Sequence, residues 1–209
     1  MTGFVAEVPQ WLNVSRETLA KLEDLCVLVK KWNPAINLVA KSSIQNIWER
    51  HLLDSAQVYF VAKRSAGLHW CDFGSGGGFP GLVIAVLAQF EHPEMAVTMV
   101  ESDKRKSIFL KEAIRALKLP ASVICGRIED IKPLDANIIS ARALGSLDKL
   151  CEYSDRHLSR NGTAIFPKGA SVGDEIAHAQ KRWVFLVDRI PSQTQKAAEI
   201  LVLRDLRHA

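Results

Sequence analysis

The stretch that decides the fold is His69-Trp-Cys-Asp72-Phe-Gly74-Ser-Gly76-Gly-Gly78-Phe-Pro-Gly81, which leads directly into Leu-Val-Ile-Ala-Val-Leu. An apolar strand runs into a glycine-rich turn, and the turn opens an apolar helix. Glycines permit the tight turn and let the backbone approach a ligand closely. In this strand-turn-helix setting the glycines predict a ligand site at the carboxyl end of the strand, in preference to a merely flexible loop.

Outward from this turn, short runs rich in β-branched residues alternate with helix-length segments. The strand-like runs are 69–73, 96–101, 121–125, 137–140, 163–166, 182–188 and 199–203, and the helical segments are 80–90, 103–118, 146–157 and 172–179. Such alternation predicts an α/β fold with a mainly parallel sheet covered on both faces. The link between the last two runs is too short for a helical crossover, so we expect that pair to be antiparallel.

The residues before this region are expected to be helical. An amphipathic pattern over 15–32 predicts a first helix, a break is expected at Pro34, and a second pattern runs from about Ser43 through Val58. We therefore expect a helical extension over 1–66, followed by one compact unit over 67–209.

Composition excludes several classes of protein. The chain has 209 residues, of which 48% are hydrophobic and 24% charged, as in ordinary globular proteins. A net charge of +4 permits a polyanionic partner without requiring one. The four cysteines form no C-x-x-C pair, and neither a signal peptide nor a membrane-length apolar run is present. We expect a cytoplasmic protein with reduced thiols and no metal site.

The glycine turn leaves two kinds of ligand open. Gly76, Gly78 and Gly81, with Glu101 at the end of the next strand, satisfy the dinucleotide fingerprint of a nicotinamide-dependent oxidoreductase. The order Asp72-x-Gly74-x-Gly76-x-Gly78 instead resembles the first motif of class I S-adenosylmethionine-dependent methyltransferases. That cofactor carries an ammonium and a sulfonium, so acids at the strand ends suit it, and Glu101 would receive its ribose hydroxyls.

Further phrases narrow the resemblance to one family. In order along the chain they are Trp32-Asn-Pro-Ala-Ile-Asn-Leu, Arg50-His-Leu-Leu-Asp-Ser, Gly74-Ser-Gly-Gly-Gly-Phe-Pro-Gly, Lys104-Arg-Lys-Ser-Ile-Phe-Leu, Gly126-Arg-Ile-Glu, Ser140-Ala-Arg-Ala-Leu-Gly-Ser-Leu and Lys168-Gly. The sequence resembles, from about residue 20 to 203, the RsmG (GidB) family, whose members methylate N7 of a guanine in small-subunit (16S) ribosomal RNA.

The resemblance implies a class I methyltransferase fold, a partner that is small-subunit ribosomal RNA or the 30S particle, and S-adenosylmethionine as cofactor. The implied cofactor-binding residues, together with the motif acid and glycines, are Asp72, Gly74, Gly76, Gly78, Phe79, Glu101, Ile128, Glu129 and Arg142. An acid after the third strand faces the ligand crevice of such a sheet, so Ile128 and Glu129 are expected to flank the adenine.

Contacts with RNA are expected from basic side chains and one histidine: Arg50, His51, Lys111, Arg115 and Lys168, with Lys104 and Arg204 as further phosphate contacts. For the residues of segment 103–118 an ordinary solvated helix face is the alternative. His51, Asp54 and Ser55 lie on one helix surface, where a structural cluster or an RNA contact is favoured over a hydrolytic triad.

No general base is expected, because N7 of guanine already presents a lone pair. Alignment of the reacting atoms can supply roughly 7 to 11 kcal/mol of the barrier. A monomer is expected. A non-catalytic RNA-binding module remains a rival alongside the oxidoreductase.

Overall fold

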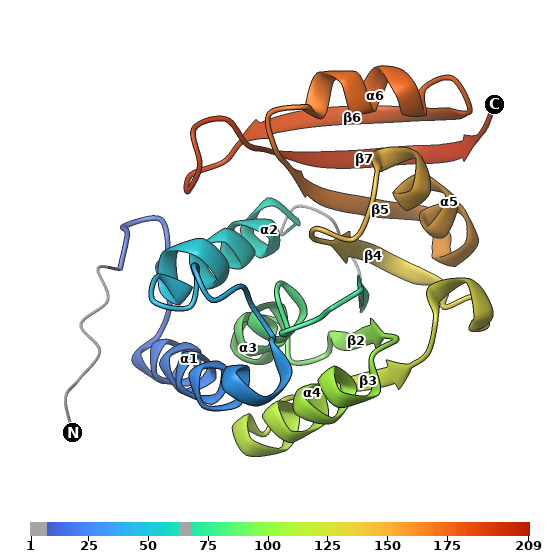
Figure 1. Cartoon of the computed structure of the whole chain (residues 1–209). Helices are drawn as coiled ribbons and strands as arrows, with labels where there is room; N and C mark the ends of the chain where they lie inside the picture. The colour runs from blue at the N-terminus through green and yellow to red at the C-terminus, as the bar shows by residue number, and fades with distance from the viewer. Residues whose placement is uncertain (1–7, 63–67) are drawn as a thin grey trace.

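The computed structural model describes residues 8–62 and 68–209. Its centre is a seven-stranded sheet in the order β3-β2-β1-β4-β5-β7-β6 (Figure 1). The strands are β1 His69–Phe73, β2 Ala96–Glu101, β3 Ala121–Cys125, β4 Ala136–Ala141, β5 Leu158–Lys168, β6 Trp183–Pro191 and β7 Glu199–His208. Strands β1 to β5 pair in parallel, whereas β7 is antiparallel to both β5 and β6. The predicted α/β sheet and its antiparallel last pair are confirmed.

Helices cover both faces of this sheet. They are α1 Arg16–Ile36, a π-helix Trp48–Leu53, α2 Asp54–Ala62, α3 Gly81–Glu91, α4 Lys104–Leu117, a 3-10 turn Ile128–Asp130, α5 Leu147–His157 and α6 Val172–Ala179. Helices α1 to α4 lie on one side and α5 and α6 on the other (Figure 1). Each side has its own apolar core: Leu22, Leu82 and Phe109 belong to the first, and Cys151 and Phe166 to the second.

Two expectations for the N-terminal part are wrong. Helix α1 continues through Pro34 to Ile36, because a proline so near the end removes only one helical hydrogen bond. Asn37 then adopts a left-handed conformation and ends the helix. Residues 43–46 form turns, and regular helix starts only near Trp48. Ile44, the one apolar residue among these four, packs against the core from a turn rather than from a helix.

Helices α1 and α2 pack on the same core as α3 and α4. The expected boundary between 66 and 67 lies outside the described residues, so the division of the chain into an extension and a compact unit stays a prediction. No helix in the described part is long and apolar enough to cross a bilayer. All four cysteines are free, and only Cys125 is exposed.

Candidate active site

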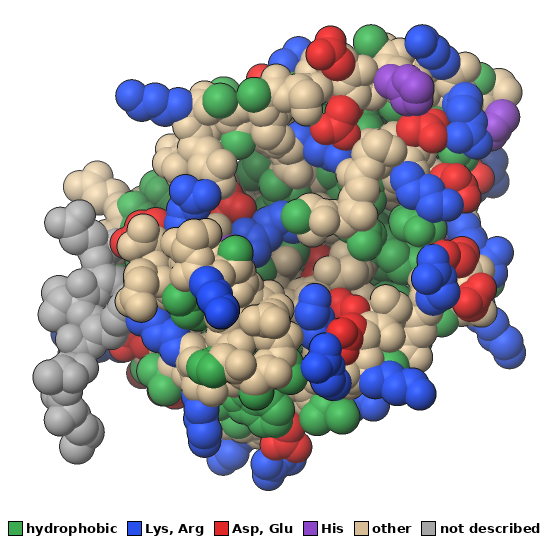
Figure 2. Space-filling view, viewed as in Figure 1, with side chains coloured by type: hydrophobic (Ala, Val, Ile, Leu, Met, Phe, Trp, Pro, Cys, Tyr) green, Lys and Arg blue, Asp and Glu red, His purple; other side chains and the backbone are tan. Residues whose placement is uncertain are grey.

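A crevice opens where the strand order reverses. Chain connections leave β1 and β4 in opposite directions across the sheet, and ligands of open α/β sheets bind outside the carboxyl ends of the strands at this point. Here the structure has a crevice of about 670 Å³. Its walls come from the loop after α1, the π-helix, the glycine turn, and the segments that follow β4 and β5. Figure 2 shows this face hollowed near its centre, with Lys and Arg side chains around the hollow.

The glycine turn is held from below by Asp72. Gly74, Gly76 and Gly78 all have positive φ, at 62°, 54° and 86°, which explains why glycine occupies these positions. The buried carboxylate of Asp72 accepts hydrogen bonds from the Gly81 N–H at 3.1 Å and from the Ser140 hydroxyl at 2.7 Å. Burial raises the pKa of Asp72 to about 6, against these hydrogen bonds, which lower it. Asp72 therefore supports the turn and does not line the crevice.

The acid at the end of β2 holds the other side of the turn. Glu101 Oε2 accepts from the Gly76 N–H at 2.7 Å, and Oε1 accepts from the Asp103 N–H at 2.8 Å. Each carboxylate oxygen keeps capacity for a further hydrogen bond. Glu101 pairs in register with the end of β3, just before the turn that carries Ile128 and Glu129. Glu101 therefore lies at the strand end next to this turn, whereas neither it nor Ile128 nor Glu129 is among the residues that line the crevice.

Arg142 is fixed in the crevice by two side chains of the π-helix and α2. Its guanidinium donates to Asp54 Oδ2 at 3.1 Å and to His51 Nδ1 at 2.8 Å, and lies 5.5 Å from the centre of the Phe79 ring. Because Nδ1 of His51 accepts, the proton sits on Nε2, which donates to the Ser43 hydroxyl at 2.7 Å. Burial, and next the Arg142 charge, lower the pKa of His51 to about 4, so the ring is neutral at pH 7.

Asp54 also fastens the loop between β6 and β7 to this site. Its Oδ1 accepts from the Thr194 hydroxyl at 2.9 Å and from Gln57 Nε2 at 3.1 Å. Gln57 Oε1 in turn accepts from the Gln193 N–H at 2.9 Å. Gln195 of the same loop lines the crevice. Sequence reasoning missed Gln57 and Thr194, since no local pattern connects residues so far apart in the chain.

Lys168 lines the crevice, but its ammonium is engaged within the protein. Nζ donates to the Gly145 carbonyl at 2.8 Å and to Glu175 at 2.7 Å. Only 8% of the Lys168 side chain is exposed, and Glu175 also accepts from the Leu147 N–H. The expected RNA contact of Lys168 stays a prediction, and it would require the ammonium to share or exchange these two partners.

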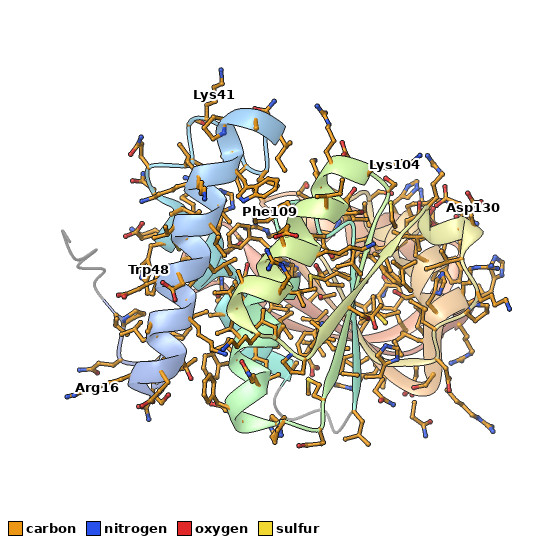
Figure 3. All side chains as sticks on the ribbon, turned by 90° about the horizontal axis from the view of Figure 1, so that it is seen from below. Arg16, Lys41, Trp48, Lys104, Phe109 and Asp130 are labelled. Atoms are coloured by element: carbon orange, nitrogen blue, oxygen red, sulfur yellow. The ribbon has the colours of Figure 1, made fainter. Side chains whose placement is uncertain are left out.

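The basic residues of α4 run along the helix away from the crevice. Asp103, which caps α4, lies beside Glu101, so Lys104 is at the crevice end. Figure 3 shows Lys104 at the same end of the molecule as Lys41, which sequence reasoning did not select. At 1.5 Å per residue, Lys111 is about 10 Å and Arg115 about 16 Å further along the axis. Arg115 is moreover paired with Glu112.

The remaining candidate residues lie partly at the crevice and partly away from it. Arg50 lines the crevice. Arg204 pairs with Asp188 across β6 and β7. Ser55 is buried, and its hydroxyl donates to the His51 carbonyl of its own helix, which rules out a hydrolytic triad with His51 and Asp54. Within 8–62 and 68–209 no group of three or more His, Cys, Asp or Glu side chains is arranged to hold a metal ion.

Two solved methyltransferase structures share this architecture. An O-methyltransferase from Bacillus cereus in complex with SAH is 11% identical, with a TM-score of 0.60 over 92% of both chains. A SAM-dependent methyltransferase from Aquifex aeolicus is 14% identical, with a TM-score of 0.60 over 86% of this chain and 98% of the other. The fold is that of the class I S-adenosylmethionine-dependent methyltransferases.

Sequence comparison defines the family within that class. The family model described as rRNA small subunit methyltransferase G matches residues 18–201, and the chain belongs to this family. Two curated relatives carry the name ribosomal RNA small subunit methyltransferase G. The one from Ruegeria pomeroyi is 50% identical over 91% of this chain and 92% of its own length. The one from Cereibacter sphaeroides is 48% identical over 94% of this chain and 95% of its own length.

Proposed function

We propose that this chain transfers the methyl group of S-adenosylmethionine to N7 of a guanine in small-subunit ribosomal RNA. The observation that carries the proposal is the family match over 18–201, because it covers both the glycine turn and the walls of the crevice. The oxidoreductase and the non-catalytic RNA-binding module do not fit a chain of this family. The chain is an RNA-modifying enzyme.

The residues around the glycine turn fit the cofactor. The backbone of residues 74–77 borders the crevice, and Glu101 offers carboxylate oxygens to the ribose hydroxyls. Ile128 offers an apolar side chain to the adenine, and Glu129, although paired with Arg127, lies at the same turn. When bound, S-adenosylmethionine supplies an activated methyl group. We assign Asp72 to the support of the turn rather than to direct contact.

The β4–β5 side of the crevice is then the acceptor site. Asp54 and His51 hold the Arg142 guanidinium in a fixed position on this side. We therefore assign Arg142, which the resemblance implied to bind the cofactor, to the acceptor nucleotide instead. Guanine N7 needs no base, so the task of these walls is to align the nucleotide and exclude water. The carboxylates of Asp54 and Glu175 also line the crevice, but each already forms an ion pair, with Arg142 and Lys168 respectively, so we assign them to the positioning of those cations.

The biological setting follows from the substrate. We propose the 30S particle or its free RNA as the partner, and the cytoplasm as the place of reaction, because ribosomal subunits assemble there. A monomer stays a prediction.

Methyl transfer to RNA that lacks the modification tests the function. The purified protein is incubated with labelled S-adenosylmethionine and either 30S particles or naked small-subunit RNA, and 7-methylguanosine is mapped by chain cleavage at the modified base. The matched control is Gly74→Val, whose Cβ would lie 2.5 Å from Leu144 Cδ1 at a backbone of positive φ. We expect label at one guanine with the wild type and none with the variant.

Calorimetric titrations with S-adenosylhomocysteine, NAD and NADP run in parallel. Binding of NAD but not of S-adenosylhomocysteine would contradict the cofactor assignment. Binding of RNA and S-adenosylhomocysteine without any methyl incorporation would favour the non-catalytic module.

A further inference from the structure

The turn expected to hold the adenine is fastened from behind by a buried histidine. His157 is the last residue of α5, and its side chain has no exposed surface. Its Nε2 lies 3.0 Å from the carbonyl oxygen of Ile128, the first residue of the 3-10 turn. A carbonyl only accepts, so Nε2 carries the proton and donates. Nδ1 is then an acceptor, buried without a hydrogen-bond partner among the described residues.

The surroundings of the ring select this state. The His157 ring packs edge-on against Phe73, with ring centres 5.3 Å apart, and Phe73 directly precedes the glycine turn. Burial lowers the pKa of His157 against the Ile128 hydrogen bond, which raises it, so the ring is neutral at physiological pH. The neutral ring with its proton on Nε2 is the form that holds the Ile128 carbonyl.

A second residue of α5 fastens the other end of the turn. Arg156 Nη2 donates to the carbonyl of Ile131 at 2.8 Å. Ile128 and Ile131 bracket the 3-10 turn, so the end of α5 holds it at two points. Within the turn, the Asp130 N–H donates to the Arg127 carbonyl at 3.1 Å and the Arg127 guanidinium donates to Glu129 Oε1, but neither hydrogen bond ties the turn to the rest of the protein. Its position thus depends on α5.

We propose that His157 is a positioning residue for cofactor binding. Its hydrogen bond to the Ile128 carbonyl fixes the positions of Ile128 and Glu129 at the adenine site. This proposal rests on the proposed function, since it assumes that the turn receives the adenine. His157 itself touches neither cofactor nor RNA. Its effect is therefore confined to the cofactor side, whereas the acceptor side is built by Arg142 and its partners.

A pair of substitutions separates the hydrogen bond from packing. His157→Gln keeps an N–H at the place of Nε2, and His157→Leu fills similar space without a donor. For His157→Leu we expect the Kd of S-adenosylhomocysteine and the KM of S-adenosylmethionine to rise by roughly fivefold to tenfold, the value of one buried hydrogen bond. The KM of the RNA should change less than twofold, and Gln should restore most of the cofactor affinity. His178→Leu, at an exposed histidine of α6, is the control.

Three results would overturn the proposal. They are equal losses for cofactor and RNA, a Gln variant as weak as the Leu variant, and an unchanged Kd in His157→Leu. If His157→Leu does not fold, Arg156→Ala decides, because Arg156 is exposed and its loss frees the other end of the turn. There we expect a smaller rise in Kd, about twofold to fivefold, and no change would be evidence against the proposal. Failure of the wild type to bind S-adenosylhomocysteine would instead refute the proposed function.

Discussion

Replacing Lys168 by Ala should lower the free energy of unfolding, whether or not the residue contacts RNA. The substitution removes the donor to the Gly145 carbonyl and leaves the Glu175 carboxylate without its cation. Loss of one partner of a buried ion pair costs about 3 to 5 kcal/mol. Since 25% of the Glu175 side chain is exposed, water compensates part of this cost, and we expect about 2 to 3 kcal/mol. In a chain of this size that lowers Tm by about 4 to 12 °C.

Thermal unfolding of three variants checks the magnitude. The double variant Lys168→Met with Glu175→Gln removes both charges and keeps an acceptor for the Leu147 N–H, so it should recover most of the lost stability. The control is Lys149→Ala, which breaks an exposed pair with Glu152 and should change stability by less than about 1 kcal/mol.

Two outcomes would refute the reasoning: an unchanged Tm for Lys168→Ala, or a double variant no more stable than the single one. The folded double variant, compared with Glu175→Gln alone because both residues line the crevice, also assigns the role of Lys168. If the variant loses methylation but keeps its affinity for S-adenosylhomocysteine, Lys168 belongs to the RNA side. If methylation and cofactor affinity fall in proportion, Lys168 belongs to the cofactor site.

Three further predictions concern the turn, the RNA and pH. Glu101→Gln should weaken binding of S-adenosylhomocysteine by about 1 to 3 kcal/mol, because a donor then faces a backbone N–H; calorimetry against the exposed control Glu94→Gln checks this, and equal affinities would contradict it. Lys104→Ala should lower the log-log salt slope of RNA binding by about 0.7 to 0.9, and Arg115→Ala by less; the reverse order in a salt titration would place the RNA along the far end of α4. The folded pKa of Asp72, raised from 3.8 to about 6, makes ionisation cost stability. The free energy of unfolding should therefore fall by up to about 3 kcal/mol between about pH 4 and 6, relative to Asp72→Asn, and this difference should stay constant above pH 6. Denaturant unfolding measures this: if the reasoning is wrong, the free energies of unfolding of the wild type and of Asp72→Asn will change with pH in parallel across that range.

Sequence reasoning succeeded where structure is determined locally. Segments 69–73, 96–101 and 121–125 coincide with β1, β2 and β3. The glycine turn was predictable because its positive φ angles require glycines, and because the strand before it and the helix after it are both recognisable apolar runs. The short link before the last run likewise dictated an antiparallel pair, since no crossover fits there.

It failed where the deciding partner lies elsewhere in the chain. The ion pair of Lys168 with Glu175 could not be predicted, because the sequence shows the residue type but not the direction of the side chain. The hydrogen bond from Thr194 to Asp54 joins residues 140 positions apart, and no pattern in the sequence near either residue predicts it. His157 carried no motif at all, because its role depends only on which carbonyl α5 happens to reach.

The place of β7 in the sheet has a consequence for how the protein is made. This strand is the last in the sequence, yet it lies inside the sheet, between β5 and β6. During synthesis β6 emerges first and has no neighbour to pair with until residues through His208 have left the ribosome. The loop that Asp54 fastens can take its place only then. The wall of the crevice that this loop supplies is thus completed only after β7 has been made, and removal of β7 would leave β6 without a neighbouring strand.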